Sequence, residues 1–165
     1  MKTETFNEIV GNAIQDNIAT TKELKISSEK NTMGIDRFIQ LVFCDNDHEH
    51  SYKVDIKALL SLLQNKALEL TDNRIDLSSH AKSTLINKAK EYAVDDDRLY
   101  NFKDPYNLTS LKHTDILKGY MLKHAISVLD MLSGKLKITD EMVLEKFGDL
   151  FNYCLLLLAL LVEDV

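Results

Sequence analysis

The chain has 165 residues, 45% of them hydrophobic and 28% charged, which suits one soluble domain with a sizeable core and excludes a disordered polypeptide. One proline and five glycines leave few chain breaks, so long helices are favoured over an all-β sandwich. The net charge of -6 and the pI near 5.3 argue against non-specific nucleic-acid binding, because phosphate contacts need clustered Lys and Arg.

The cysteines and the apolar segments indicate the compartment. Cys44 and Cys154 do not form a disulfide framework and fit a reducing cytosol, and the first residues lack the apolar segment of a signal peptide. The apolar run Cys154 to Val162 has nine residues, about half of the roughly 20 needed to cross a bilayer. We therefore expect a cytoplasmic protein without a membrane partner, with this run buried in the core or at an oligomer interface.

In the N-terminal part, the sequence predicts one helix followed by a β-hairpin. A capping box and a helical period predict a helix from about Thr5 to Thr21, followed by a polar connection from Lys25 to Gly34. The β-branched and aromatic run Phe38 to Phe43 and the alternating run Ser51 to Ile56 predict two strands that pair around Asp45 to His50.

Two further helices are predicted in the middle of the chain. Asp55 is the expected N-cap of a helix with an apolar face from Ile56 to Ala67. A loop from Leu70 to Leu77 follows, and Ser78 or Ser79 opens the next helix.

The C-terminal part is predicted to be two long helices. The first follows a turn at Asp104 to Asn107 and ends near Gly134, and Thr139 caps the second. The expected fold is therefore mainly α: an antiparallel helical bundle with a small N-terminal β-hairpin. We treat residues 1–165 as a single domain, with 1–78 as an N-terminal elaboration and 79–165 as the bundle core.

The last helix carries a polar stripe that could bind a cation. Glu145, Asp149 and Asn152 share one helix face, with Glu141 one turn earlier. Two carboxylates on adjacent turns can share Mg²⁺, which prefers oxygen ligands and leaves waters for a phosphate substrate. The alternative is a solvated face opposite the apolar one.

The preceding helix offers a second polar stripe of Lys123, Ser127 and Asp130, with His124 beside Lys123. In an antiparallel pair, Lys123 could lie near the carboxylates, where it would bind a substrate phosphate or neutralise Asp149. An ordinary surface ion pair would give the same pattern.

Two loop segments also carry candidate groups. In the segment from Asp95 to Phe102, Arg98 could bind a phosphate while Tyr100 or Phe102 stacks on a base; alternatively, the segment is a charged turn anchored by a buried Phe102. The segment from Cys44 to His50 is rich in potential metal ligands, but it lacks the ligand spacing of a zinc site, and we interpret it as a polar hairpin tip.

Three blocks of the sequence carry a family resemblance. "EYAVDDDRLYNFK", "GYMLKHAISVLDML" and "EKFGDLFNYCLLLLALL" resemble, in this order, motifs of a family of small phage and prophage proteins. That family is similar to the phage nucleotide-modification-associated domain and, more distantly, to the MazG-like all-α nucleotide pyrophosphohydrolases. The resemblance covers about half of the chain and implies an oligomeric helical bundle that binds a nucleotide between helices, in the host cytoplasm if the protein is phage-encoded.

The resemblance also implies the site residues. The positions that match the motifs are Arg98, Asn101, Phe102, Lys123, His124, Asp130, Glu145, Asp149, Asn152 and Tyr153. MazG-like enzymes hold Mg²⁺ with two pairs of acidic residues and release pyrophosphate from a nucleoside triphosphate. Here Lys146 and Lys88 stand where two of those acids would be expected.

Two functions follow as hypotheses. In the first, the protein binds a nucleotide, and Mg²⁺-dependent hydrolysis of that nucleotide is the extended form of the hypothesis. Glu145 and Asp149 hold Mg²⁺, Lys123 and Arg98 contact phosphate, and Tyr153 or Phe102 packs on the base. In the second, it is a non-enzymatic interaction protein that binds a host protein or sequesters a signalling nucleotide.

Overall fold

The computed structural model describes residues 1–27, 34–44, 49–86 and 94–164, and the described elements are helical. In chain order they are α1 Thr3–Ser27, α2 Ile35–Cys44, α3 Glu49–Leu70, α4 Leu77–Ala81, η1 Lys82–Ile86, η3 Tyr100–Phe102, α5 His113–Leu132, α6 Asp140–Met142, η4 Val143–Phe147 and α7 Gly148–Glu163. Two of these, η1 and η4, are π-helical turns that continue α4 and connect α6 to α7. The prediction of a mainly α protein is confirmed.

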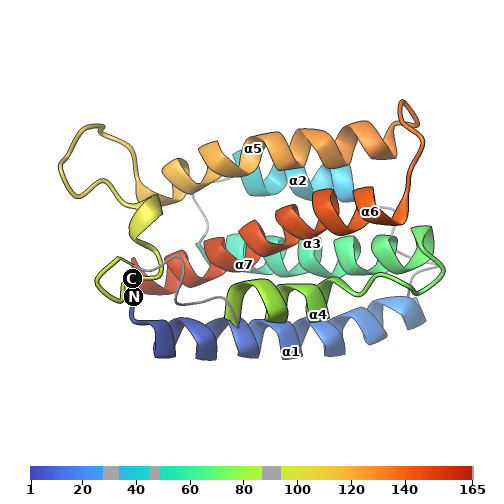
Figure 1. Ribbon diagram of the computed structural model, residues 1–165, viewed down its shortest axis with the longest axis horizontal. Helices are drawn as coiled ribbons and strands as arrows, with labels where there is room; N and C mark the ends of the chain where they lie inside the picture. Colours follow the sequence, from blue (N-terminus) through green and yellow to red (C-terminus); the bar gives the residue numbers. More distant parts are fainter. Residues whose placement is uncertain (28–33, 45–48, 87–93, 165) are drawn as a thin grey trace.

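Helix α7 is the central element of the bundle. It packs against α5, α3, α1 and α4, and the long helices run along the same axis of the molecule (Figure 1). A helix that is apolar on nearly all sides has to be buried on nearly all sides. This explains the position of the leucine-rich segment, in which Cys154, Leu155 and Leu157 are fully buried within one chain. Burial in the core, one of the two expected outcomes, is therefore what the structure shows for this segment.

The N-terminal helices contribute to the same core. In α1, Phe6, Val10 and Ile14 follow the spacing of one helix face and are buried, as the sequence predicts. In α3, buried Leu59 and Leu63 lie on one face, which packs against α1, α2 and α7.

The predicted β-hairpin is wrong, because both of its strands are helices. Phe38 to Phe43 lies within α2, where Ile35, Ile39 and Val42 form one buried face with helical spacing. Ser51 to Ile56 lies within α3, where Tyr52 and Ile56 are buried but Val54 between them is 54% exposed. The apparent alternation is thus one turn of a helix, with Val54 on the solvent side.

The same correction applies to two predicted boundaries. Asp55 is inside α3, which begins at Glu49, so it is not an N-cap. The next helix begins at Leu77 rather than at a serine, because the carboxylate of Asp76 accepts hydrogen bonds from the backbone N–H groups of Ser78 and Ser79, at 3.0 and 3.3 Å. The first residues of the predicted Lys25 to Gly34 connection belong to α1, and residues 28–33 of it lie outside the described residues. Residues 45–48, which make up most of the predicted hairpin tip, also lie outside them.

The boundaries predicted for the C-terminal helices are confirmed. Helix α5 ends at Leu132, and Gly134 follows with a φ of +80°, a left-handed conformation that favours glycine. The hydroxyl of Thr139 accepts a hydrogen bond from the Met142 N–H at 3.2 Å and caps α6.

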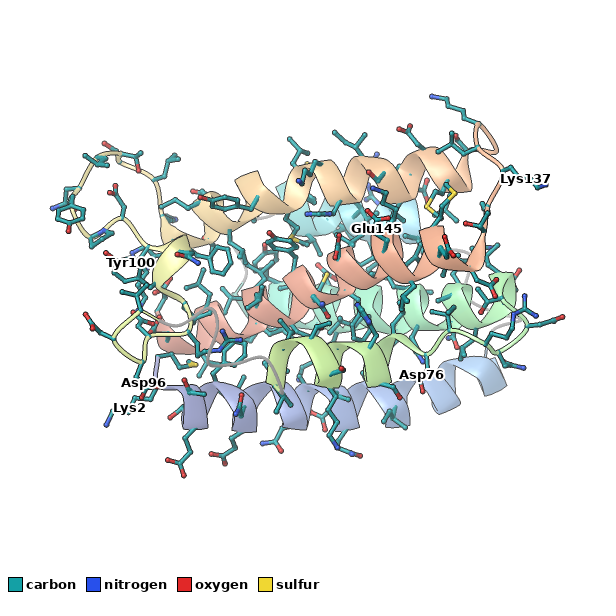
Figure 2. All side chains as sticks on the ribbon, in the orientation of Figure 1. Lys2, Asp76, Asp96, Tyr100, Lys137 and Glu145 are labelled. Carbon is teal, nitrogen blue, oxygen red and sulfur yellow. The ribbon has the colours of Figure 1, made fainter. Side chains whose placement is uncertain are left out.

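The two chain ends meet at one end of the bundle (Figure 1). Four charges at this end form what we call the terminal ion cluster. The Met1 amine lies 2.6 Å from Asp97 and 2.5 Å from Glu163, and the Lys103 ammonium lies 2.7 Å from Asp97 and 3.0 Å from Glu163. Asp96 adds a hydrogen bond from the hydroxyl of Thr3, and Figure 2 shows Lys2, Asp96 and Tyr100 at this end.

No helix in the described part of the chain is long and apolar enough to cross a membrane.

Candidate functional site

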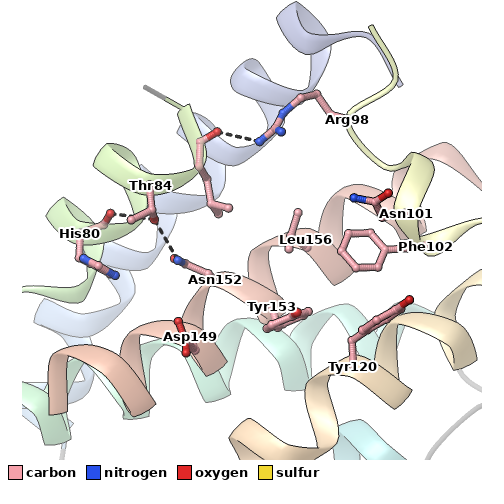
Figure 3. Close-up of a pocket in the computed structure, with 11 residues that line it drawn as sticks. His80, Thr84, Arg98, Asn101, Phe102, Tyr120, Asp149, Asn152, Tyr153 and Leu156 are labelled. Atoms are coloured by element: carbon pink, nitrogen blue, oxygen red, sulfur yellow. Dashed lines mark hydrogen bonds between the residues drawn. The ribbon is translucent and has the colours of Figure 1, made fainter. Parts of the chain in front are cut away.

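A cavity of about 570 Å³ lies where the segment before α5 meets α4, α5 and α7 (Figure 3). A volume of this size is within the range of small-molecule sites. Its lining residues are His80, Thr84, Leu85, Arg98, Asn101, Phe102, Tyr120, Asp149, Asn152, Tyr153 and Leu156. Six residues selected from the sequence therefore line one cavity: Arg98, Asn101, Phe102, Asp149, Asn152 and Tyr153.

Helix α7 supplies the polar floor of the cavity through Asp149 and Asn152, which are three residues apart and so share one helix face. The Asn152 Nδ2 atom lies 2.9 Å from Oγ1 of Thr84 in η1, and the Thr84 hydroxyl lies 3.0 Å from the backbone carbonyl oxygen of His80 (Figure 3). A chain of two hydrogen bonds thus connects α7 to the α4–η1 helix across one side of the cavity.

The close approach of these two helices depends on Gly148. A Cβ atom at this position would lie 3.0 Å from Cδ2 of His80 and 3.1 Å from its Nε2, closer than nearly all real Cβ contacts. The absent side chain therefore lets the His80 imidazole lie directly against α7 at the edge of the cavity.

Aromatic rings form the opposite wall. The ring of Phe102 makes edge-to-face contacts with Tyr120, at a centroid distance of 5.8 Å, and with Tyr153, at 6.3 Å. The imidazole of His124 stacks on Tyr153 at 5.0 Å. Figure 3 shows Phe102, Tyr120 and Tyr153 converging from three different elements. Such a wall suits a flat ring system as ligand.

Asp149 carries the negative charge of the cavity floor and has a neighbouring imidazole. Nδ1 of His124 lies 3.4 Å from Oδ2 of Asp149. Burial lowers the pKa of His124, and the charges of Lys123 and Lys146 act in the same direction while Asp149 opposes them. Burial also raises the pKa of Tyr153, with the Asp149 charge as a further cause.

Arg98 lines the cavity but is largely occupied by the core. Arg98 is only 5% exposed. Its Nη2 donates a hydrogen bond to the backbone carbonyl of Leu85 at 3.0 Å, and its guanidinium lies 4.6 Å from the centre of the Phe6 ring. These contacts tie the 94–102 segment to η1 and α1, so Arg98 shapes the cavity wall.

Four of the ten residues selected from the sequence do not line this cavity: Lys123, His124, Asp130 and Glu145. Lys123 is exposed on α5, and the residue that reaches Asp149 from this helix is its neighbour His124, which itself lies behind Tyr153. Glu145 is 65% exposed and pairs with Lys146 at 3.2 Å, away from the ion-cluster end of the bundle (Figure 2).

The side chains that line the cavity do not supply enough oxygen ligands to hold a magnesium ion without a bound nucleotide. Asp149 is the single carboxylate that lines the cavity among the residues that the structure describes, and no group of three or more His, Cys, Asp or Glu side chains converges within that part of the chain. Lys88, which stands where one of the family's acids would be expected, lies outside the described residues.

Sequence reasoning missed His80, Thr84 and Tyr120. His80 and Thr84 are four residues apart, and this spacing places them on one face of a helix that the sequence predicts. That spacing was the available signal, but a polar pair of this kind also occurs on any solvated helix face.

Comparisons of the chain with protein-family models, with curated proteins and with solved structures find no match. The resemblance to phage and MazG-like proteins therefore remains a prediction.

Proposed function

We propose that the protein binds a nucleotide in the cavity between α4, α5 and α7. The observation that carries this proposal is the composition of the cavity: three aromatic rings on one wall face amide and carboxylate groups on the floor. A nucleotide offers a flat, polarisable base together with hydrogen-bonding edges and sugar hydroxyls, and each part has a counterpart in this lining.

The proposal is binding rather than turnover. Because one carboxylate lines the described cavity, a magnesium ion would need ligands from the nucleotide phosphates and from water as well as Asp149. Hydrolysis to the monophosphate and pyrophosphate stays a hypothesis of the family resemblance, and we derive no catalytic step for it.

The experiment is a thermal-shift and calorimetry screen with nucleosides and nucleoside mono-, di- and triphosphates, with and without Mg²⁺. We expect at least one of these to bind and to raise the melting temperature. Asn152→Leu should abolish this shift, while Glu145→Gln, an acidic residue outside the cavity, should preserve it. If no member of the panel binds the wild-type protein, the proposal is wrong. Pyrophosphate release, measured in parallel, tests the catalytic hypothesis.

A second candidate function is protein binding, and the segment between η3 and α5 favours it. The carboxylate of Asp104 accepts hydrogen bonds from the backbone N–H groups of Leu108 and Thr109, at 2.8 and 2.7 Å, which fixes the turn. The turn projects from the bundle (Figure 1) and leaves Tyr106 77% and Leu108 82% exposed. Exposed apolar side chains on a fixed turn are suited to contact with a partner protein, such as a host protein or a second copy of this chain.

The test uses a double variant with Tyr106→Ser and Leu108→Ser. If the turn binds a partner, this variant should lose a host protein that the wild type captures, or should become monomeric where the wild type is oligomeric. Asn152→Leu serves as the matched control and should retain the partner. Equal capture and equal mass for wild type and double variant would contradict this candidate.

A further inference from the structure

The hydrogen bonds around Thr84 determine which way the Asn152 amide faces. A hydroxyl group has one proton to donate, and that of Thr84 is directed at the backbone carbonyls of His80 and Ala81, at 3.0 and 3.4 Å. Towards Asn152, Oγ1 of Thr84 can then only accept a hydrogen bond. The amide must present its Nδ2 to Thr84, as the 2.9 Å contact indicates, because a flipped amide would place two acceptors against each other.

This arrangement leaves Oδ1 of Asn152 as an acceptor without a donor. Oδ1 is buried and has no hydrogen-bond partner among the described residues. Buried polar atoms nearly always have a partner, and leaving one unpaired is costly. Asn152 lines the cavity, so a ligand that displaces the side chains covering Oδ1 is a natural source of the missing donor.

A second acceptor lies one turn away. Asp149 precedes Asn152 by three residues on the same face of α7 and also lines the cavity. The arginine that lines the cavity, Arg98, already contacts the carbonyl of Leu85 and the ring of Phe6. The floor therefore presents acceptors, and it favours the base end of a nucleotide over its phosphate end.

We propose that the cavity holds a nucleobase whose exocyclic amino group donates a hydrogen bond to Oδ1 of Asn152. An amino group has two hydrogens and can serve two neighbouring acceptors, whereas a ring N–H or a hydroxyl has one. A ligand ammonium group would also match the acceptors, but the rings of Phe102, Tyr120 and Tyr153 on the facing wall select a flat ring. This inference rests on the proposed nucleotide-binding function and deepens it.

The test compares ligands that differ only in the amino group. Three pairs serve: adenosine and purine riboside, cytidine and zebularine, and guanosine and inosine, each measured by calorimetry as the nucleoside and as the 5′-monophosphate. For at least one pair we expect the ligand without the amino group to bind roughly tenfold or more weakly, the loss expected for one buried hydrogen bond.

Thr84→Val then separates amide orientation from general damage to the site. Without the hydroxyl, the Asn152 amide can turn and offer Nδ2 to a ring nitrogen, so the preference for the amino ligand should fall to near unity while binding persists. Thr84→Ser keeps the hydroxyl and should keep the preference.

Three outcomes would count against the inference in different ways. If ligands bind but both members of every pair bind equally, the amino-group contact is wrong and the nucleotide site stands. If the preference is the same in Thr84→Val as in the wild type, the proposed role of Thr84 in orienting the amide is wrong. If no nucleoside or nucleotide binds at all, the proposed function itself is wrong.

Discussion

The terminal ion cluster and the cavity share two parts of the chain but use their polar groups differently. Both take residues from the segment 94–103 and from α7. In the cluster, each carboxylate faces two cations and each cation faces two carboxylates, so the charges are neutralised within the protein. Oε2 of Glu163 is buried without a hydrogen-bond partner among the described residues, but the charge of this carboxylate is balanced through Oε1. In the cavity, Oδ1 of Asn152 lacks a partner among the described residues, and Asp149 is 41% exposed beside a weakly basic imidazole.

The two regions show that buried polar groups can serve either folding or ligand binding. The paired charges of the cluster are three-quarters or more buried. Removing one partner would leave the remaining charges without compensation, which lowers the free energy of unfolding. Unpaired acceptors contribute nothing to folding and are costly until a ligand supplies a donor. Changes in the cluster should therefore affect stability, and changes in the cavity should affect binding.

The largest expected effect is the loss of stability when the cluster is broken. Asp97→Asn would leave the Met1 amine and Lys103 with one carboxylate between them. We expect the free energy of unfolding to fall by about 1–3 kcal/mol, as measured by denaturant titration. The control is Glu145→Gln, which removes an exposed acid and should change this free energy by less than about 0.5 kcal/mol. Equal stability of the two variants would show that the cluster does not hold the chain ends.

The cluster should also make stability depend on pH. Burial tends to raise the pKa of Asp97 and of Glu163, but hydrogen bonds from Lys103 and the Met1 amine outweigh it and hold both below their ordinary values of 3.8 and 4.5. A carboxylate with a lowered pKa stabilises the fold above its ordinary pKa, and this contribution is lost as the pH falls. The stability difference between wild type and Asp97→Asn should therefore be constant near neutral pH and shrink as the pH falls through 3.8, the ordinary pKa of Asp97. A difference that grows on acidification would contradict this assignment.

The matching change in the cavity should have a small effect on folding. Asn152→Leu removes the unpaired acceptor and the hydrogen bond to Thr84 together, and these losses have opposite signs. We expect the free energy of unfolding to stay within about 1 kcal/mol of the wild type, while calorimetry shows no nucleotide binding. A loss as large as that of Asp97→Asn would mean that Asn152 serves the fold and would remove the contrast between the two regions.

The sequence predicted the long helices correctly and failed for a short one. The helices that became α5 and α7 have long periodic apolar faces, and Thr139 and Gly134 mark their ends. Helix α2 was missed because the six-residue run Phe38 to Phe43 is too short to distinguish a strand from a buried helix. Its helical spacing becomes clear only when Ile35, outside that run, is counted with Ile39 and Val42.

The candidate site was predicted in part for a different reason. Asn101, Phe102, Asn152 and Tyr153 carry polar or aromatic groups in distinctive blocks, and they do line one cavity. The sequence could not show that the Arg98 guanidinium would lie on Phe6, or that His124 rather than Lys123 would reach Asp149. Both depend on the rotation of packed helices about their axes, which spacing along one helix does not determine.

The smallest expected effect on stability comes from changes in the projecting turn, where the side chains of Tyr106 and Leu108 are exposed rather than buried. Tyr106 and Leu108 are more than three-quarters exposed, so the Tyr106→Ser and Leu108→Ser double variant removes little buried apolar area. We expect its free energy of unfolding to lie within about 0.5 kcal/mol of the wild type in denaturant titration, and its nucleotide affinity to be unchanged. Asp104→Ala should differ, because it removes the acceptor for two backbone N–H groups and should raise hydrogen exchange in the turn. If the double variant were instead destabilised as strongly as Asp97→Asn, the exposed side chains would have to pack against the bundle in solution, and the turn would belong to the fold rather than to a partner surface.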